Sequence, residues 1–138
     1  MTLILIALFG STAVSTHAQS PNGLRANVPF DFIIGDKTLH AGKITVGGMT
    51  QSAAGPTSIS NLSNGEHAFR IGRRVISSAP SDQAKLVFHK YGSRYYLAQV
   101  WIPGYKAWEL VPSVSEKNEM RLARNSQPEV VNVVADGQ

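Results

Sequence analysis

Histidine and carboxylate side chains are the residues of this sequence that could bind a metal ion. The histidines after residue 18, and the carboxylates that could join them as metal ligands, are His40, His67, His89, Glu66, Asp82 and Glu109. Three such ligands from different strands can hold a zinc ion. The sequence contains no His-x-His or HExxH pair, so His67 and His89 are only weak metal candidates, and we expect no metal and no cofactor.

Catalytic patterns are also weak. Acid and base catalysis by two carboxylates needs a fixed separation across a cleft, and the acidic residues here are singletons near expected strand ends and turns. There is no Gly-x-Ser-x-Gly elbow and no glycine-rich phosphate loop. A small hydrolase or metal-assisted enzyme stays open as the alternative, with a site in which His89, Glu66 and Glu109 would have to converge.

Aromatic residues gather between positions 91 and 108. Exposed tyrosine and tryptophan rings beside cations form platforms for sugars, bases or peptides. On this basis the candidate ligand-binding residues are Tyr95, Trp101, Tyr105, Trp108, Lys90 and Arg94. Packing of the same rings in the core is the competing interpretation.

Strands must position these side chains, because turn-forming residues interrupt the sequence roughly every 8 to 12 residues. This spacing predicts an all-β fold, an antiparallel β-sandwich or small barrel of about seven or eight strands. We expect residues 19–128 to form a single domain with one surface helix near its C-terminal end. Residues 24–34 are expected as a first strand, with Pro29 at an edge or bulge because proline cannot donate to a ladder.

Two hairpins are predicted. The first joins residues 57–62 to residues 67–77 through Asn64-Gly65, a pair typical of turns with positive φ at both central residues. The second joins residues 84–91 to residues 94–102 through Gly92-Ser93. Its predicted cross-strand pairs are Tyr91 with Arg94, Lys90 with Tyr95, His89 with Tyr96, Phe88 with Leu97, Val87 with Ala98 and Leu86 with Gln99.

The predicted helix covers residues 113–124. Ser113 and Glu116 have the spacing of a capping box, and Arg121 and Arg124 stand late, where the helix dipole favours cations. Its apolar face is thin, which indicates a surface position. Residues 129–138 are expected as a tail or a last strand, whose four valines could pair with a partner along a strand edge.

The composition limits the possible chemistry and partners. The 138 residues include no cysteine, which excludes a thiol nucleophile and any thiolate metal site, and leaves stability to packing and hydrogen bonds. The net charge of +4 favours anionic partners. Solubility is the competing interpretation of this charge, so the partner stays unknown, and the candidates are an anionic glycan, the envelope surface or a protein. The sequence has no long basic block, and we expect no specific nucleic acid.

Residues 1–18 have the pattern of a secretory signal peptide. An apolar run from Leu3 to Val14 is followed by Ser15, Thr16, His17 and Ala18, although the first ten residues lack the usual lysine or arginine. The run is shorter than the roughly 20 apolar residues of a membrane span. We therefore expect cleavage, no integral membrane anchor after it, and a periplasmic or extracellular location.

Three short motifs carry a family resemblance. They are ANVPFDFIIG at residues 26–35, LHAG at 39–42 and KLVFHKYG at 85–92. In this order and spacing they resemble a group of short exported bacterial proteins of unknown function, over most of residues 26–124. Such relatives tend to have Leu-Pro-Ala-Gly where this sequence has His40. The resemblance implies export and a compact β domain, and it implies no activity.

Together these observations favour an exported, non-catalytic binding or envelope-associated structural module of unknown ligand over an enzyme. Tyrosine and tryptophan side chains in an open patch would support the module. Titratable side chains converging in a cleft would support the hydrolase alternative.

Overall fold

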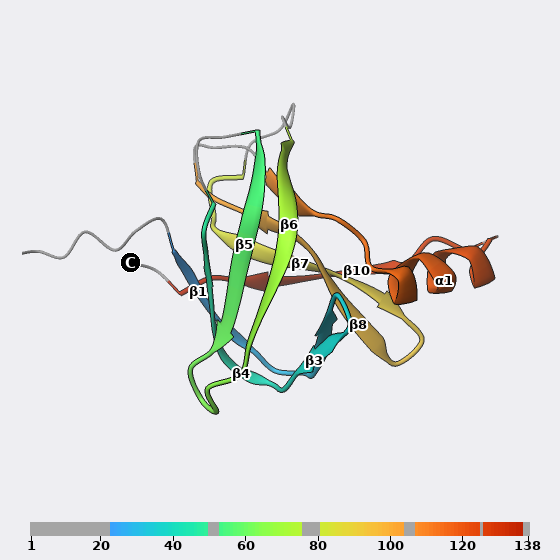
Figure 1. Ribbon diagram of the computed structural model, residues 1–138, viewed down its shortest axis with the longest axis horizontal. Helices are drawn as coiled ribbons and strands as arrows, with labels where there is room; N and C mark the ends of the chain where they lie inside the picture. Colours follow the sequence, from blue (N-terminus) through green and yellow to red (C-terminus); the bar gives the residue numbers. More distant parts are fainter. Residues whose placement is uncertain (1–22, 50–52, 76–80, 104–106, 125, 137–138) are drawn as a thin grey trace, which may run out of the picture.

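The computed structural model describes residues 23–49, 53–75, 81–103, 107–124 and 126–136. These ranges contain ten strands and one helix (Figure 1). The strands are β1 (Leu24–Val28), β2 (Phe32–Ile34), β3 (Lys37–Leu39), β4 (Gly42–Gly47), β5 (Ala54–Asn61), β6 (His67–Val75), β7 (Lys85–Tyr91), β8 (Arg94–Trp101), β9 (Ala107–Leu110) and β10 (Glu129–Val134), and the helix is α1 (Val114–Leu122). The predicted all-β fold with one late helix is confirmed.

The strands form one mixed, sandwich-like sheet in the order β1-β4-β5-β6-β9-β8-β2-β3, while β7 pairs with β8 and β10 pairs with β7. All pairs are antiparallel except the short contact of β2 with β8. The backbone N–H of Asp136 donates to the carbonyl oxygen of Arg25 over 2.8 Å, which brings the end of β10 to β1. No ladder joins these two strands in the described ranges, so the sheet stays open.

The core lies between two parts of the sheet whose strands cross steeply. In Figure 1, β5 and β6 run nearly vertically, whereas β7 and β10 run nearly horizontally. Apolar side chains from both parts meet between them; the largest that are fully buried are Tyr96, Phe32, Phe88, Leu39, Ile44, Ile59 and Leu86. The rings of Phe32 and Phe88 meet edge to face with centroids 5.2 Å apart. Burial of such rings dominates core energetics.

The segment expected as one strand over residues 24–34 is two strands. Pro29 lacks an N–H for a ladder, and the chain bends after it at Phe30. The Oδ1 atom of Asp31 accepts a hydrogen bond from the backbone N–H of Ala41 over 2.9 Å. This bend directs β2 toward β3 and β8, and it is one reason why the sheet has more strands than the turn spacing predicts.

The hairpin of β5 and β6 pairs as predicted, but its turn differs from the expected type. Within this turn only Gly65 has a positive φ, at 77°. Elsewhere in the described ranges positive φ angles are confined to glycine. The N–H of Gly65 donates to the carbonyl of Asn61, and the side-chain oxygen of Asn64 accepts from the N–H of Glu66. Asn64 therefore supports the turn with its side chain and needs no strained backbone.

The hairpin of β7 and β8 has the predicted register from the Tyr91–Arg94 pair to the Phe88–Leu97 pair. A β-bulge then shifts the ladder, so that Gln99 lies opposite Val87. The predicted partners Val87 with Ala98 and Leu86 with Gln99 are wrong, because Ala98 is an extra residue on one strand.

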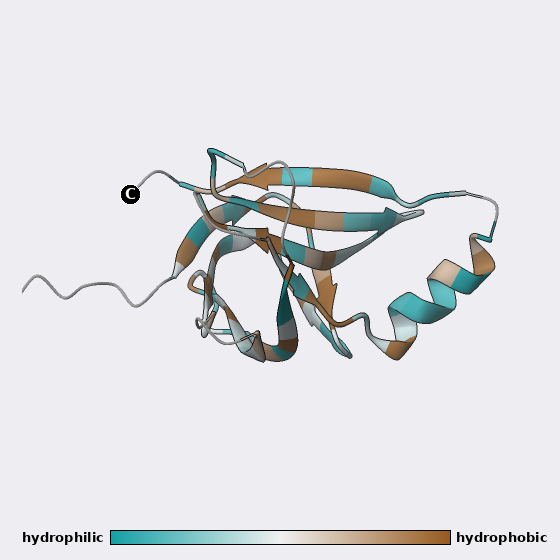
Figure 2. Cartoon of the chain, turned by 90° about the horizontal axis from the view of Figure 1, so that it is seen from above, coloured by the Kyte–Doolittle hydropathy of each residue, from teal (hydrophilic) through white to brown (hydrophobic). Residues whose placement is uncertain are grey.

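The helix begins and ends close to its predicted limits. The Oγ atom of Ser113 accepts a hydrogen bond from the N–H of Glu116 over 3.1 Å, which is one half of the expected capping box. The helix projects from the body in Figures 1 and 2, and Val114 and Leu122 are exposed. Among the described residues no helix has the length and apolar character needed to cross a membrane.

Candidate functional site

The outward-facing side of β6 carries large apolar side chains that are open to solvent. Phe69 is 68% exposed and Ile71 is 53% exposed. On the inward side, the ring of Trp108 occupies the space that a Cβ atom at residue 72 would need. Only glycine fits there, and Ala68 is the other small inward residue. Since side chains alternate along a strand, Phe69 and Ile71 lie on the side opposite Ala68 and Gly72 and face water.

The register of β4, β5 and β6 places a single surface around these two side chains. Ser58 lies opposite Phe69, and Pro56 lies opposite Ile71. On β4, Gly47 lies opposite Ser58 and Thr45 lies opposite Ser60, so small residues continue this surface. We call the resulting surface the outer face; its members are Thr45, Gly47, Pro56, Ser58, Ser60, His67, Phe69, Ile71 and Arg73. Its large side chains lie along β6, and the residues beside them on β4 and β5 are small, three of them with hydroxyl groups.

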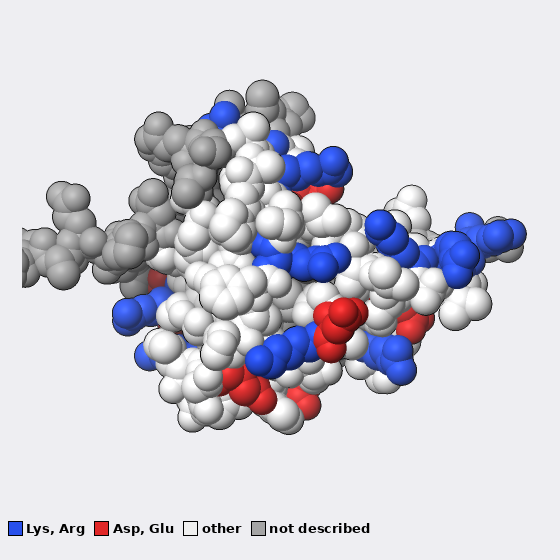
Figure 3. All heavy atoms as spheres, viewed as in Figure 1, with Lys and Arg blue, Asp and Glu red and all other residues white. Residues whose placement is uncertain are grey.

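Cations border the outer face. Arg25 of β1 lies opposite Thr45, and Lys43 precedes that threonine by two residues on the same side of β4. At the other end Arg73 donates to Glu109 over 2.8 Å. In Figure 3 uncharged surface covers much of the region of β5, with both basic and acidic groups around it. Arg73 is thus paired with a carboxylate, whereas exposed Arg25 and Lys43 leave positive charge at the β1–β4 side, which is suited to an anionic partner.

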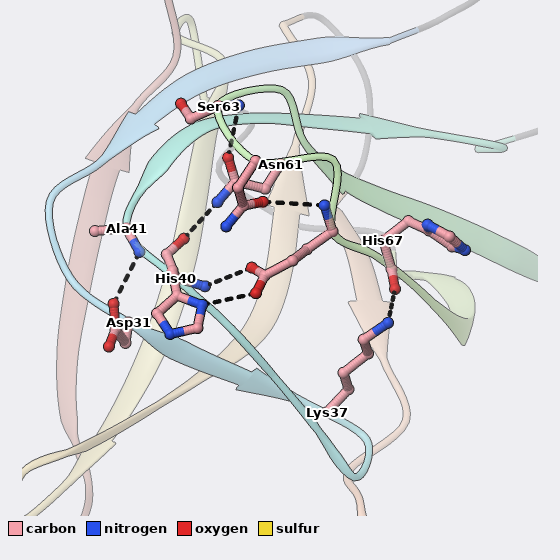
Figure 4. Close-up of polar contacts among 9 residues, drawn as sticks. Asp31, Lys37, His40, Ala41, Asn61, Ser63 and His67 are labelled. Carbon is pink, nitrogen blue, oxygen red and sulfur yellow. Dashed lines mark hydrogen bonds and ion pairs between the residues drawn. The ribbon is translucent and has the colours of Figure 1, made fainter.

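A polar network lies at one end of the outer face, where it joins the β3–β4 turn to the β5–β6 turn (Figure 4). Glu66 accepts hydrogen bonds from the backbone N–H of His40 over 2.9 Å and pairs with its ring Nδ1 over 2.7 Å. The hydrogen bond from the His40 backbone, followed by those of the Asn64 and His40 side chains, lowers the pKa of Glu66 to about 2. The hydrogen bond to Glu66, and the charges of Glu66 and Asp31, raise the pKa of His40.

Buried Asn61 joins the same two turns. Its Nδ2 donates to the carbonyl of His40 over 2.8 Å, and its Oδ1 accepts from the N–H of Ser63 over 2.9 Å. The Oγ of Ser63 in turn accepts from the backbone N–H of Lys43 over 3.1 Å. These polar groups are hydrogen-bonded within the protein. The network therefore holds together the two turns at this end of the outer face.

The side chains of the hydrolase alternative do not meet. Glu66 pairs with His40, Glu109 pairs with Arg73, and the Nδ1 atom of His89 lies 3.2 Å from a carboxylate oxygen of Glu116. His67 faces outward, with its ring edge to face with Phe69. Within the described ranges no group of three metal-ligating side chains gathers.

The candidate aromatic residues lie in different places. Tyr95 stacks on Phe30 with centroids 3.8 Å apart, and Lys90 lies over its ring. Trp101 has Lys85 over its ring. Lys85 and Lys90 are five positions apart on β7, so their side chains point to opposite sides of the sheet. Trp101 and Tyr95, which they cover, therefore lie on opposite sides as well.

The remaining candidates are also dispersed. Trp108 is 3% exposed and donates its Nε1–H to the hydroxyl of buried Thr57. Arg94 donates to Glu119 of the helix over 3.3 Å. Tyr105 lies outside the described residues. A single platform built from the six candidates is therefore not assembled among the described residues, and a ligand role for any of them stays a prediction.

Sequence reasoning missed Phe69 and Ile71, although a signal was present. In residues 67–73 alanine and glycine stand at two of the three positions between the large side chains, and Arg70 stands at the third. Small residues on one side of a strand indicate that another element packs closely there. The large residues must then occupy the open side.

Comparison with known protein families, curated proteins and solved structures finds no match. The resemblance to short exported bacterial proteins accordingly stays a prediction.

Proposed function

We propose that this protein is an exported, non-catalytic binding module of the cell envelope that holds an extended anionic glycan on its outer face. The observation that carries the proposal is the exposure of Phe69 and Ile71 on regular strands. Adjacent apolar side chains that stay in water on a regular strand form a patch, and exposed patches of this kind mark binding sites.

The chemistry of the outer face fits a sugar polymer. An aromatic ring such as that of Phe69 can pack against the apolar face of a sugar. The hydroxyl groups of Thr45, Ser58 and Ser60 lie on the neighbouring strands, within the same surface. Arg25 and Lys43 supply charge-assisted hydrogen bonds for carboxylate or sulfate groups.

The polar groups support binding over catalysis. Both carboxylate oxygens of Glu66 are engaged by His40. A general base needs access to the proton that it removes, and this carboxylate is already committed to a loop contact. Export is proposed from residues 1–18, which lie outside the described residues.

The first prediction concerns the large side chains of β6. Replacing Phe69 and Ile71 by alanine removes the packing surface while leaving the inward side of β6 unchanged, so binding of polygalacturonate, an anionic polysaccharide, should weaken at least tenfold, or about 1.4 kcal/mol. Isothermal titration calorimetry measures this loss.

Leu122→Ala is the matched control, because Leu122 is 84% exposed on the distant helix and its loss should leave binding unchanged. Binding of the natural sequence should also fall as salt is raised, and neutral dextran should bind more weakly. Failure of the natural sequence to bind the anionic polymer, or equal loss in the control, would contradict the proposal.

A further inference from the structure

The side of α1 that faces the sheet is polar. Three of its side chains contact side chains of β7 and β8 over 2.9 to 3.3 Å, and the pairs are Ser115 with Tyr96, Glu116 with His89, and Glu119 with Arg94. Residues three and four positions apart lie on the same side of a helix, so residues 115, 116 and 119 define the side that meets the sheet.

The apolar side chains of α1 point away from the sheet. All three are exposed: Val114 by 71%, Met120 by 49% and Leu122 by 84%. A helix on the surface of a globular domain ordinarily turns its apolar side toward the core. In α1 this arrangement is reversed, and packing within the domain does not account for its apolar residues.

Cations share the outward side of α1. Lys117, Arg121 and Arg124 are exposed, and Arg121 lies one helical turn from each of the other two. Asn118, Arg121, Leu122 and Arg124 border a single open hollow of the surface. Figure 3 shows basic groups along the end of the molecule where α1 projects in Figure 1, with acidic groups beside them. Positive and apolar groups therefore stand next to each other on this side of the helix.

We propose that the outward side of α1 docks on a membrane surface that contains anionic lipids, with the helix lying along that surface. The aliphatic stems of Arg121 and Arg124 can rest on apolar groups while their guanidinium groups reach lipid phosphates. Val114 and Leu122 lie about 12 Å apart along the helix axis and enter the apolar edge of the headgroup layer. The projection of α1 from the body leaves this side accessible (Figures 1 and 2).

The exposed apolar side chains favour a lipid surface over a soluble polyanion. A nucleic acid or an acidic polysaccharide would engage the cations and leave Leu122 in water. An anionic lipid surface accommodates both kinds of group at once. Because α1 lies outside the outer face, this docking does not depend on the proposed glycan binding.

Co-sedimentation with vesicles tests the proposal. The natural protein should bind vesicles of equal parts phosphatidylglycerol and phosphatidylcholine, bind pure phosphatidylcholine vesicles more weakly, and release as salt is raised. Arg121→Gln should weaken binding about fivefold, and Leu122→Ala at least about threefold. Arg74→Gln is the matched control, because it removes the same charge from an exposed position on β6 and should change binding little. All of these proteins share residues 1–18, so differences between them report on α1.

A fluorescent label provides a second measurement that does not depend on charge. The protein has no cysteine, so Leu122→Cys can carry a single environment-sensitive dye. Its emission should shift to the blue on the phosphatidylglycerol vesicles, whereas the same dye on Ser58→Cys, in the outer face, should not respond. Circular dichroism verifies that each variant keeps the fold.

Three results would overturn the proposal: no binding of the natural protein to the anionic vesicles, an unshifted label at residue 122, or equal loss in Arg74→Gln and Arg121→Gln. The last result would show attraction by net charge alone. Binding of polygalacturonate is measured separately and should be unchanged by Leu122→Ala, so this proposal and the proposed function fail independently.

Discussion

Single residues hold the loops of this protein in place, and the His40–Glu66 pair is the clearest case. The carboxylate of Glu66 contacts both the backbone and the ring of His40 across the β3–β4 and β5–β6 turns. A hydrogen-bonded, charge-assisted contact of this kind is sensitive to pH in a definite direction. The sequence does not reveal the pair, because the two residues lie on different turns that only the folded sheet brings together.

The pH dependence follows from the two pKa shifts. The pKa of Glu66 falls from 4.5 to about 2, so its contribution to stability is present above pH 4.5 and is lost as the pH falls toward 2. The pKa of His40 rises above 6.5, so its contribution is present below pH 6.5 and is lost at higher pH. We predict that Glu66→Gln reduces the free energy of unfolding most between about pH 4.5 and 6.5.

Urea unfolding of the natural and Glu66→Gln proteins from pH 2 to 8 measures this window. Glu129→Gln is the control, since that carboxylate is mostly exposed and lies 3.6 Å from Lys90 and a surface pair contributes little. A Glu66→Gln effect of the same size at pH 3 as at pH 5.5 would refute the assignment.

At the scale of elements, local signals predict most of what the structure contains. The capping spacing places the helix, and the Gly92-Ser93 turn sets the first pairs of the β7–β8 hairpin. Local signals fail where a distant contact decides the outcome. The bulge at Ala98 is an example, since β8 meets β7 on one edge and both β9 and β2 on the other. No local pattern specifies how these neighbours are accommodated.

The helix cap provides the prediction at this scale. Ser113→Ala removes the acceptor for the N–H of Glu116, which lies in a buried position, and should cost about 1 kcal/mol of stability. Hydrogen exchange should show faster exchange in the first turn of α1, with little change in β5 and β6. Ser113→Asp retains an acceptor and should preserve protection, and equal loss in both variants would show that the cap contributes nothing.

For the molecule as a whole, the fold was more predictable than the site. Period-two alternation is enough to predict strands, whereas the exposure of a strand side depends on what packs on its other side. Trp108 illustrates the difference, because it was expected as a candidate on an aromatic patch and instead lies over Gly72 in the core. Its burial leaves Phe69 and Ile71 outside, and thereby creates the outer face.

The most direct test of the binding proposal is an NMR titration of the isotope-labelled protein with short oligogalacturonate. The account predicts chemical-shift changes concentrated at the amides of β4, β5 and β6, including those of Ser58, Phe69 and Ile71, with the far strands β7 and β10 little affected. Changes centred on Tyr95 or Trp101, or none at any oligosaccharide concentration, would contradict it.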